Sequence, residues 1–156
     1  MRIGINQFCF PAPCDVREAM ERAKALGYEC MEVCLTADRT TGCSAGGVTD
    51  ALDISGYYNS LLHEHAGERE FSALRALAEE IGLPLSSVGG IVSFSIYPLT
   101  ARDPAVAQKS MDAVRRMLDA AQAIGAASAL VIPGLLTADM GYQEGYELAQ
   151  QRLTEL

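Results

Sequence analysis

The acidic residue with the clearest potential for chemistry is Glu32, which lies within the otherwise apolar segment 30–35. Successive side chains of an extended strand point to opposite faces, so Glu32 shares a face with Cys30 and Cys34 while bulkier apolar side chains take the other. A carboxylate on a covered face must be paired or hydrogen-bonded, because burying it alone is costly. Two roles stay open: binding of substrate hydroxyls within an active-site network, or a structural carboxylate held by Arg2 or a backbone donor.

Two other patterns could carry chemistry but have simpler interpretations. His63 and His65 flank Glu64, but a zinc site requires a third ligand in an ordered frame, so we interpret this segment as a solvated acidic surface. Residues 42–46 match the G-x-S-x-G pattern of hydrolases, with Ser44 at its centre. That pattern works on a sharp strand-to-helix turn. Here it lies in a glycine-rich stretch with no helical pattern after it, so we interpret it as a chance match.

The elements that must position these residues are indicated by a repeated pattern. Three times a helical stretch ends in a large aliphatic residue and a glycine, and an extended run follows; the glycines are Gly27, Gly82 and Gly125. A glycine just past a helix can adopt the left-handed conformation that closes the helix, after which the chain turns into a strand. Repetition of helix, glycine and buried strand is typical of a βα sheet or barrel.

Hydrophobic periodicity predicts four strand-then-helix units. Strands are expected at 2–8, 30–35, 85–88 and 130–132, and helices at 15–26, 71–81, 104–124 and 142–156. We expect a capping box at Asp15 and a proline-started helix after Asp103. Long loops at 36–67 and 89–102 follow the second and third strands, where α/β folds build their ligand sites. The pattern therefore predicts an α/β fold of four successive βα units with parallel strands, in a single domain over residues 1–156.

Composition narrows the possible partners and the compartment. With 156 residues, of which 49% are hydrophobic, the chain can bury one core. Its net charge of −8 disfavours nucleic acid and anionic membrane surfaces as partners. No segment resembles a membrane span or a secretory signal, so we expect a cytoplasmic protein. Five cysteines without a C-x-x-C pair predict reduced, mostly buried thiols, with Cys9 and Cys34 as packing residues.

Residues 1–6 (MRIGIN) and 25–33 (ALGYECMEV) together resemble the first two strands of the sugar phosphate isomerase/epimerase family. Segment 77–84 is similar to the exit of that family's second helix, and segments 98–104 and 120–126 are similar to the two ends of its third helix. These proteins are xylose isomerase-like TIM barrels. The resemblance therefore implies that the chain forms the N-terminal half of a (β/α)8 barrel.

The resemblance also implies a function: proton transfer next to the carbonyl of a sugar or sugar phosphate, assisted by a divalent metal such as Mn, Co or Mg. The family's catalytic and metal-binding residues come from later strands, so we expect them outside this chain and expect no metal to be bound by this chain alone. What carries over is one wall of the substrate pocket, formed by Asn6, Phe8, Glu32, Gly89, Pro133 and Gly134. The ends of the third and fourth strands lack the metal-binding histidines of the endonuclease IV branch, which disfavours DNA repair.

Four parallel strands cannot close a barrel, so the inner face and two sheet edges would meet water. Three arrangements remain open: the first half of a longer enzyme, a homo-oligomer or other pairing with a second half-barrel, or an open flavodoxin-like sheet. Two functions besides a sugar isomerase or epimerase also remain open. One is a non-catalytic half-barrel that acts as a binding or assembly subunit, and the other is a lyase or dehydratase on the same barrel.

Overall fold

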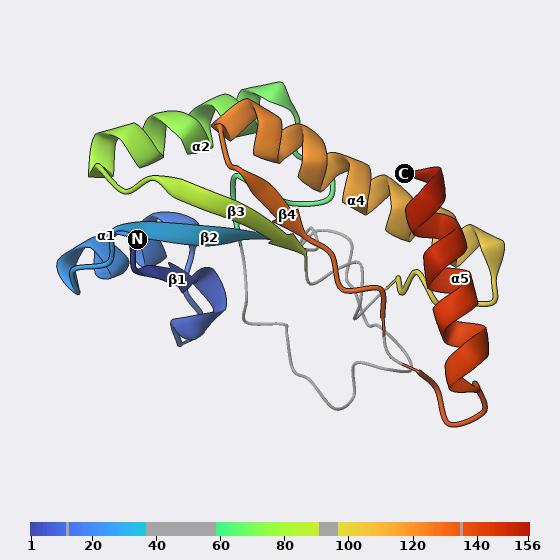
Figure 1. The fold of residues 1–156 in the computed structure, drawn as a ribbon. Helices are drawn as coiled ribbons and strands as arrows, with labels where there is room; N and C mark the ends of the chain where they lie inside the picture. The colour runs from blue at the N-terminus through green and yellow to red at the C-terminus, as the bar shows by residue number, and fades with distance from the viewer. Residues whose placement is uncertain (12, 37–58, 91–96, 135) are drawn as a thin grey trace.

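Four parallel strands form one sheet in the order β1-β2-β3-β4, and helices alternate with them along the chain (Figure 1). The computed structural model describes residues 1–11, 13–36, 59–90, 97–134 and 136–156. The strands are β1 (Gly4–Asn6), β2 (Cys30–Leu35), β3 (Leu85–Gly90) and β4 (Ser128–Leu130). The helices are α1 (Val16–Ala25), α2 (Glu68–Ile81), α4 (Pro104–Ile124) and α5 (Tyr142–Glu155), with a short 3-10 helix η1 (Gln7–Cys9). The predicted α/β class is confirmed.

Glycines end two of the helices as the sequence predicts. Gly82 closes α2 with φ 69° and Gly125 closes α4 with φ 74°, and each donates its backbone N–H to carbonyls of the last helical turn. Side chains other than glycine avoid this left-handed conformation, so the chain reverses at these two points and enters β3 and β4. The short helix-to-strand connections follow directly from these caps.

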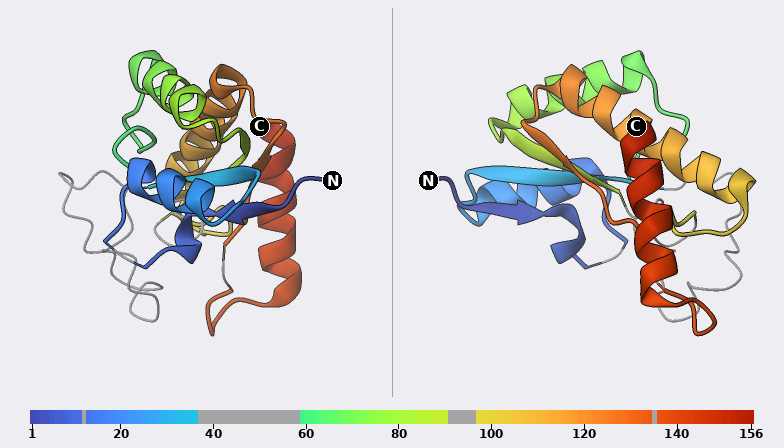
Figure 2. Two further views of the ribbon diagram at one scale, coloured as in Figure 1. Left: turned by 90° about the vertical axis from the view of Figure 1, so that its left-hand side faces the viewer. Right: turned by 45° about the vertical axis from the view of Figure 1, so that its right-hand side comes forward.

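The core lies between the helices and one face of the sheet. Met31, Val33 and Leu35 of β2 are fully buried there, together with Val88 of β3. Figure 1 shows α2 and α4 side by side over the sheet, and Figure 2 shows α5 standing beyond the ends of the strands. The alternation predicted for segment 30–35 is therefore confirmed, because the bulky residues face the helices and Glu32 faces away from them.

The first and last strands differ from their expected bounds. The strand predicted over 2–8 ends at Asn6, because the Asn6 side chain accepts the Phe8 N–H at 2.7 Å and turns the chain into η1. The strand predicted over 130–132 lies two residues earlier. The Ala127 N–H donates to the Ser86 carbonyl at 3.1 Å, and this bond sets the register of β4 against β3.

Two local expectations are wrong. Gly89 lies within β3, paired with Cys34, and not in a loop after the strand. Asp15 precedes α1, but its carboxylate makes no capping bond to the helix. Instead it accepts the Ser60 backbone N–H at 2.9 Å and the Ser60 hydroxyl at 2.7 Å. A distant partner therefore takes the side chain that the local pattern assigned to the helix.

A buried amide fixes the return of the chain toward α2. Asn59 is fully buried, and its amide nitrogen donates to the Gln7 side-chain oxygen at 3.1 Å and to the Cys34 carbonyl at 3.3 Å. A parallel bridge between Thr36 and His63 continues the ladder beyond β2. These bonds satisfy polar groups that would otherwise be buried without partners, so they hold segment 59–66 firmly against the end of β2.

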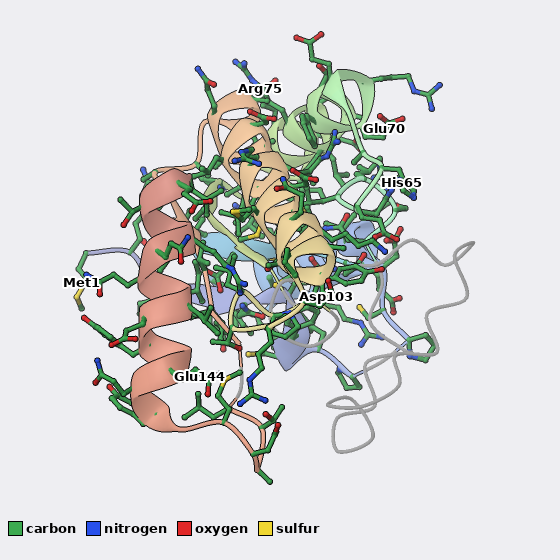
Figure 3. All side chains as sticks on the ribbon, turned by 90° about the vertical axis from the view of Figure 1, so that its right-hand side faces the viewer. Met1, His65, Glu70, Arg75, Asp103 and Glu144 are labelled. Carbon is green, nitrogen blue, oxygen red and sulfur yellow. The ribbon has the colours of Figure 1, made fainter. Side chains whose placement is uncertain are left out.

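Helix α5 is joined to the rest of the protein by charged side chains (Figure 3). Arg102, just before α4, donates to the Asp139 carboxylate at 2.5 Å and to both oxygens of Glu144 at 2.6 and 2.9 Å. Arg152 of α5 is buried and donates to the Leu99 carbonyl. The Thr137 hydroxyl and the Arg102 guanidinium lower the pKa of Asp139 to about 2, which keeps this carboxylate ionised.

Apolar side chains are exposed where the sheet ends. Leu130 and Ile132 are 49% and 36% exposed at the β4 edge, and Tyr142 and Tyr146 of α5 are 72% and 52% exposed. Nothing in the described part of the chain covers this region.

Within the same described residues, no helix combines the length and the apolar character that crossing a membrane requires.

Candidate functional site

The register of the sheet brings polar residues into one row. Asn6 pairs with Glu32, Glu32 pairs with Ser87, and Ser87 pairs with Ser128, one residue from each strand. Paired residues of neighbouring parallel strands project to the same face. The row therefore lies on the face opposite the helices, which is the inner face of a barrel.

Glu32 is the centre of this row, and both of its carboxylate oxygens accept hydrogen bonds. Asn6 Nδ2 donates to Oε1 at 2.5 Å, and Ser87 Oγ donates to Oε2 at 2.6 Å. The donors are side chains of the two neighbouring strands, so the expected alternative of Arg2 or a backbone donor is wrong for the described residues. The bonds fix the orientation of the carboxylate, which is half-buried and keeps lone pairs for further donors.

Cys34 and Gly89 lie next to this carboxylate. The Cys34 thiol is 1% exposed and lies 3.7 Å from Asn6 Oδ1. Burial, reinforced by the negative charge of Glu32, raises the pKa of the Cys34 thiol, so this group stays protonated and is no nucleophile. Cys9, by contrast, is exposed, and its expected packing role is wrong.

Gly89 leaves space beside Glu32. A Cβ atom at position 89 would lie 3.4 Å from Cys34 Sγ and 3.5 Å from Glu32 Oε1. These are ordinary van der Waals distances, so a side chain as small as that of alanine would fit beside the carboxylate. Among the predicted pocket residues, the structure brings Asn6, Glu32 and Gly89 together.

The other three predicted pocket residues take different positions. Phe8 donates its backbone N–H to Asn6 Oδ1, and its ring packs against the core. The Pro133 carbonyl accepts the Thr100 N–H at 3.3 Å. Gly134 has φ 134°, and a Cβ there would lie 2.8 Å from Thr100 Oγ1. Pro133 and Gly134 thus contact the segment that precedes α4. None of the described contacts joins them to Glu32.

Sequence reasoning missed Ser87 and Asn59. Ser87 is one of two adjacent serines in a short strand, and only the register could have shown that it is Ser87 that lies beside Glu32. A shift in register between Met31 and Glu32 sets that pairing. Asn59 follows two tyrosines in a polar stretch, without a periodic signal to single it out.

The histidine pair lies apart from this site. His63 Nδ1 accepts the His65 N–H at 3.2 Å, and His65 lies 3.9 Å from a Glu64 oxygen. In the described part of the chain no three His, Cys, Asp or Glu side chains gather in an arrangement that could hold a metal ion. The G-x-S-x-G segment at 42–46 lies outside the described residues.

Four parallel βα units with helices on one face and a polar row on the other are the architecture of half a (β/α)8 barrel. Residues 20–156 match the family described as xylose isomerase-like TIM barrel. The chain belongs to this family, as the sequence resemblance predicts.

Solved structures of three relatives share the fold over 99% of this chain. D-allulose 3-epimerase from Methylomonas sp. is 18% identical, with a TM-score of 0.61 over 47% of its own chain. The 3-keto-D-glucoside 4-epimerase from E. coli is 14% identical, with a TM-score of 0.61 over 50% of its chain. Endonuclease IV from Thermus thermophilus is 20% identical, with a TM-score of 0.52 over 47% of its chain.

The chain therefore spans about half the length of the solved structures that it matches. No curated protein sequence matches it. At these identities the likeness concerns the fold, and the chemistry must be argued from the residues themselves.

Proposed function

We propose that this chain forms one wall of the active site of a sugar or sugar-phosphate isomerase or epimerase, which moves a proton next to a ketose carbonyl. Membership of the xylose isomerase-like family supports this class. The observation that carries the proposal is the Glu32 carboxylate, held between Asn6 and Ser87 on the inner face of the sheet. Such an oriented acceptor suits a substrate with several hydroxyl groups.

In this proposal Glu32 binds and orients the substrate. Each of its oxygens has accepted one bond from the protein, and each keeps a lone pair toward the barrel interior. Two neighbouring hydroxyls of a sugar can donate to these lone pairs, which fixes the rotation of the sugar before proton transfer. Holding the reacting carbon in one orientation supplies part of the rate enhancement by itself.

The groups that move the proton are expected from the other half of the barrel, as is the divalent metal. The described residues do not fit a metal site, because they present no cluster of three suitable ligands. Glu32 offers one carboxylate whose oxygens are both already hydrogen-bonded. We therefore assign this chain a role in substrate positioning, and assign proton transfer to residues beyond it.

The test is Glu32→Gln in the complete protein. Gln has the same shape and can accept from Asn6 and donate to Ser87, so the melting temperature should change little. Turnover of a ketose substrate should fall about tenfold or more, because a neutral amide accepts hydrogen bonds from the substrate hydroxyls more weakly than a carboxylate does. Glu79→Gln on the outer surface of α2 is the matched control and should leave turnover unchanged. A loss of folding with normal activity per folded molecule would make Glu32 purely structural.

A second function, a non-catalytic half-barrel that serves as an assembly subunit, is favoured by one observation. Leu130 and Ile132 expose apolar surface at the β4 edge, where a fifth strand would pair. In this alternative the same inner face is covered by a second half-barrel without catalysis. If the Glu32→Gln variant still pairs with a second half-barrel and turns over ketoses no more slowly than the wild-type protein, the non-catalytic alternative is favoured over the enzyme.

A further inference from the structure

A separate cleft lies on the helix side of the sheet, between the segment before α2 and the N-terminal half of α4. Its volume is about 310 Å³, and its polar lining consists of Glu64, His65, Tyr97, Lys109, Asp112 and Arg116. This volume lies at the lower end of the range for small-molecule sites, roughly 300–1,000 Å³. Figure 3 shows His65 beside α4 on the side away from α5. The cleft is distinct from the Glu32 row, which faces the opposite way.

Three residues of one face of α4 build the floor of the cleft. Lys109, Ala113 and Arg116 follow one another at helical spacing of four and three residues, so their side chains share that face. Ala113 is small and 8% exposed, which leaves room between the two longer cations. The two cations therefore lie two helical turns apart on one face of α4, with Asp112 and Ala113 between them in the lining.

The two cations have neutral partners. Arg116 Nη1 donates to the Ala66 carbonyl at 2.7 Å, and the Lys109 ammonium lies 5.1 Å from the centre of the Tyr97 ring. Among the described residues, no carboxylate oxygen lies within 4.0 Å of either cation. In contrast, Arg75 lies 3.1 Å from the Glu79 carboxylate.

Two acids, Glu64 and Asp112, also line the cleft, so its carboxylates and its Lys and Arg side chains are equal in number. Asp112 is held by its own neighbours on α4, accepting from Arg115 at 3.1 Å and from Gln108 at 2.9 Å. A Glu64 carboxylate oxygen lies 3.9 Å from His65 Nε2. The cleft thus has cations on its α4 side, and a carboxylate and an aromatic ring on its other side.

We propose that this cleft binds a small phosphorylated sugar or polyol. The phosphate would lie between Lys109 and Arg116, because a guanidinium and an ammonium together match its charge and its acceptor oxygens. The hydroxylated part would lie against Tyr97 and donate to Glu64. Since the cleft is on the outer face, this ligand is a second one and does not react at Glu32.

The experiment is calorimetric titration of the purified protein with fructose 6-phosphate, fructose and inorganic phosphate at low salt. At this cleft we expect binding of fructose 6-phosphate, weaker binding of inorganic phosphate, and no binding of fructose that depends on Lys109 or Arg116. Lys109→Gln and Arg116→Gln should each weaken the binding about tenfold, because each removes a charge-assisted bond. Added NaCl should weaken it further.

Two controls separate this site from the inner face. Arg75→Gln removes an equal charge from α2 and should leave the affinity unchanged. Glu32→Gln should also leave it unchanged, so failure of the proposed catalytic role would not affect the result. Arg116→Gln could loosen the segment that ends at Ala66, and Lys109→Gln, on an exposed side chain, is the variant that decides in that case. No binding to the wild-type protein, or equal binding by Lys109→Gln, would overturn the proposal.

Discussion

The Ser87 hydroxyl of β3 donates to Glu32 Oε2 of β2 at 2.6 Å, across 55 residues of sequence. Together with Asn6 on the other side, it leaves the carboxylate one orientation. The two donors are uncharged, so they orient Glu32 without neutralising it. A carboxylate held in one orientation by uncharged donors is suited to accept hydrogen bonds from the hydroxyl groups of a ligand.

Replacing Ser87 by Ala should separate orientation from charge. The variant keeps the Glu32 carboxylate but removes one of its two donors, and we expect unfolding to become easier by about 1 kcal/mol. For the proposed isomerase or epimerase activity of the complete protein, the Michaelis constant should rise more than turnover falls, because ground-state positioning is weakened. Urea denaturation and steady-state kinetics measure the two effects. Ser72→Ala on the exposed surface of α2 serves as the control, and equal kinetics for Ser87→Ala and wild type would contradict the assignment.

Replacing Asn59 by Leu should destabilise the protein strongly. The change removes the amide that donates to the Gln7 side-chain oxygen and to the Cys34 carbonyl, and it removes the oxygen that accepts the Leu61 N–H. The Gln7 oxygen keeps its bond from the Cys34 N–H. Loss of hydrogen bonds in a buried network costs about 1–3 kcal/mol, so the free energy of unfolding should fall by about 2 kcal/mol or more. Gln151→Leu on the exposed side of α5 should change it by less than about 0.5 kcal/mol. Similar denaturation midpoints for the two variants would show that the buried network contributes little.

Acid should release α5 over a defined pH window. The pKa of Asp139 is lowered to about 2 in the folded protein, from 3.8. A lowered pKa means that the ionised form stabilises the fold, so this contribution is complete above about pH 4 and is lost as pH falls toward 2. The protection factor of the segment before α5, which is the intrinsic exchange rate at the same pH divided by the observed rate, should therefore fall between these values. In Asp139→Asn the protection factor should already be lower at neutral pH and should change less over that window; identical profiles would contradict the prediction.

Residues 1–156 alone should associate in solution. Leu130 and Ile132 expose apolar surface beside an unpaired strand edge, which favours pairing with a second chain. Multi-angle light scattering should show dimers or larger species at micromolar concentration. Leu130→Lys together with Ile132→Lys should shift the protein toward monomer. Leu118→Lys, at an exposed apolar position on the outer side of α4, should not. A monodisperse wild-type monomer would count against this surface as a site of pairing.

The parts of the fold that could be predicted are those set by local sequence. Alternation within segment 30–35 was sufficient to place Glu32 on the inner face, because the period of a strand requires no knowledge of its neighbours. The left-handed caps at Gly82 and Gly125 are likewise local. These features determined the order of the elements and the class of the fold.

The parts that could not be predicted depend on contacts between distant segments. The bounds of β4 follow from a bond between Ala127 and Ser86, and the partner of Asp15 is Ser60, not its own helix. The donors to Glu32 likewise depend on the register of three strands. A sequence pattern can show that a carboxylate needs partners, but the register decides which residues they are.

The shared register of Asn6, Glu32 and Ser87 makes the proposed substrate-binding face depend on the edge of the sheet. Each of the three residues belongs to a different strand, and β1 is a three-residue strand at the edge of the sheet. Fraying of that edge would free the carboxylate long before the core melts. Heat or mild denaturant should then break the hydrogen bonds that orient Glu32 while the helices are still intact.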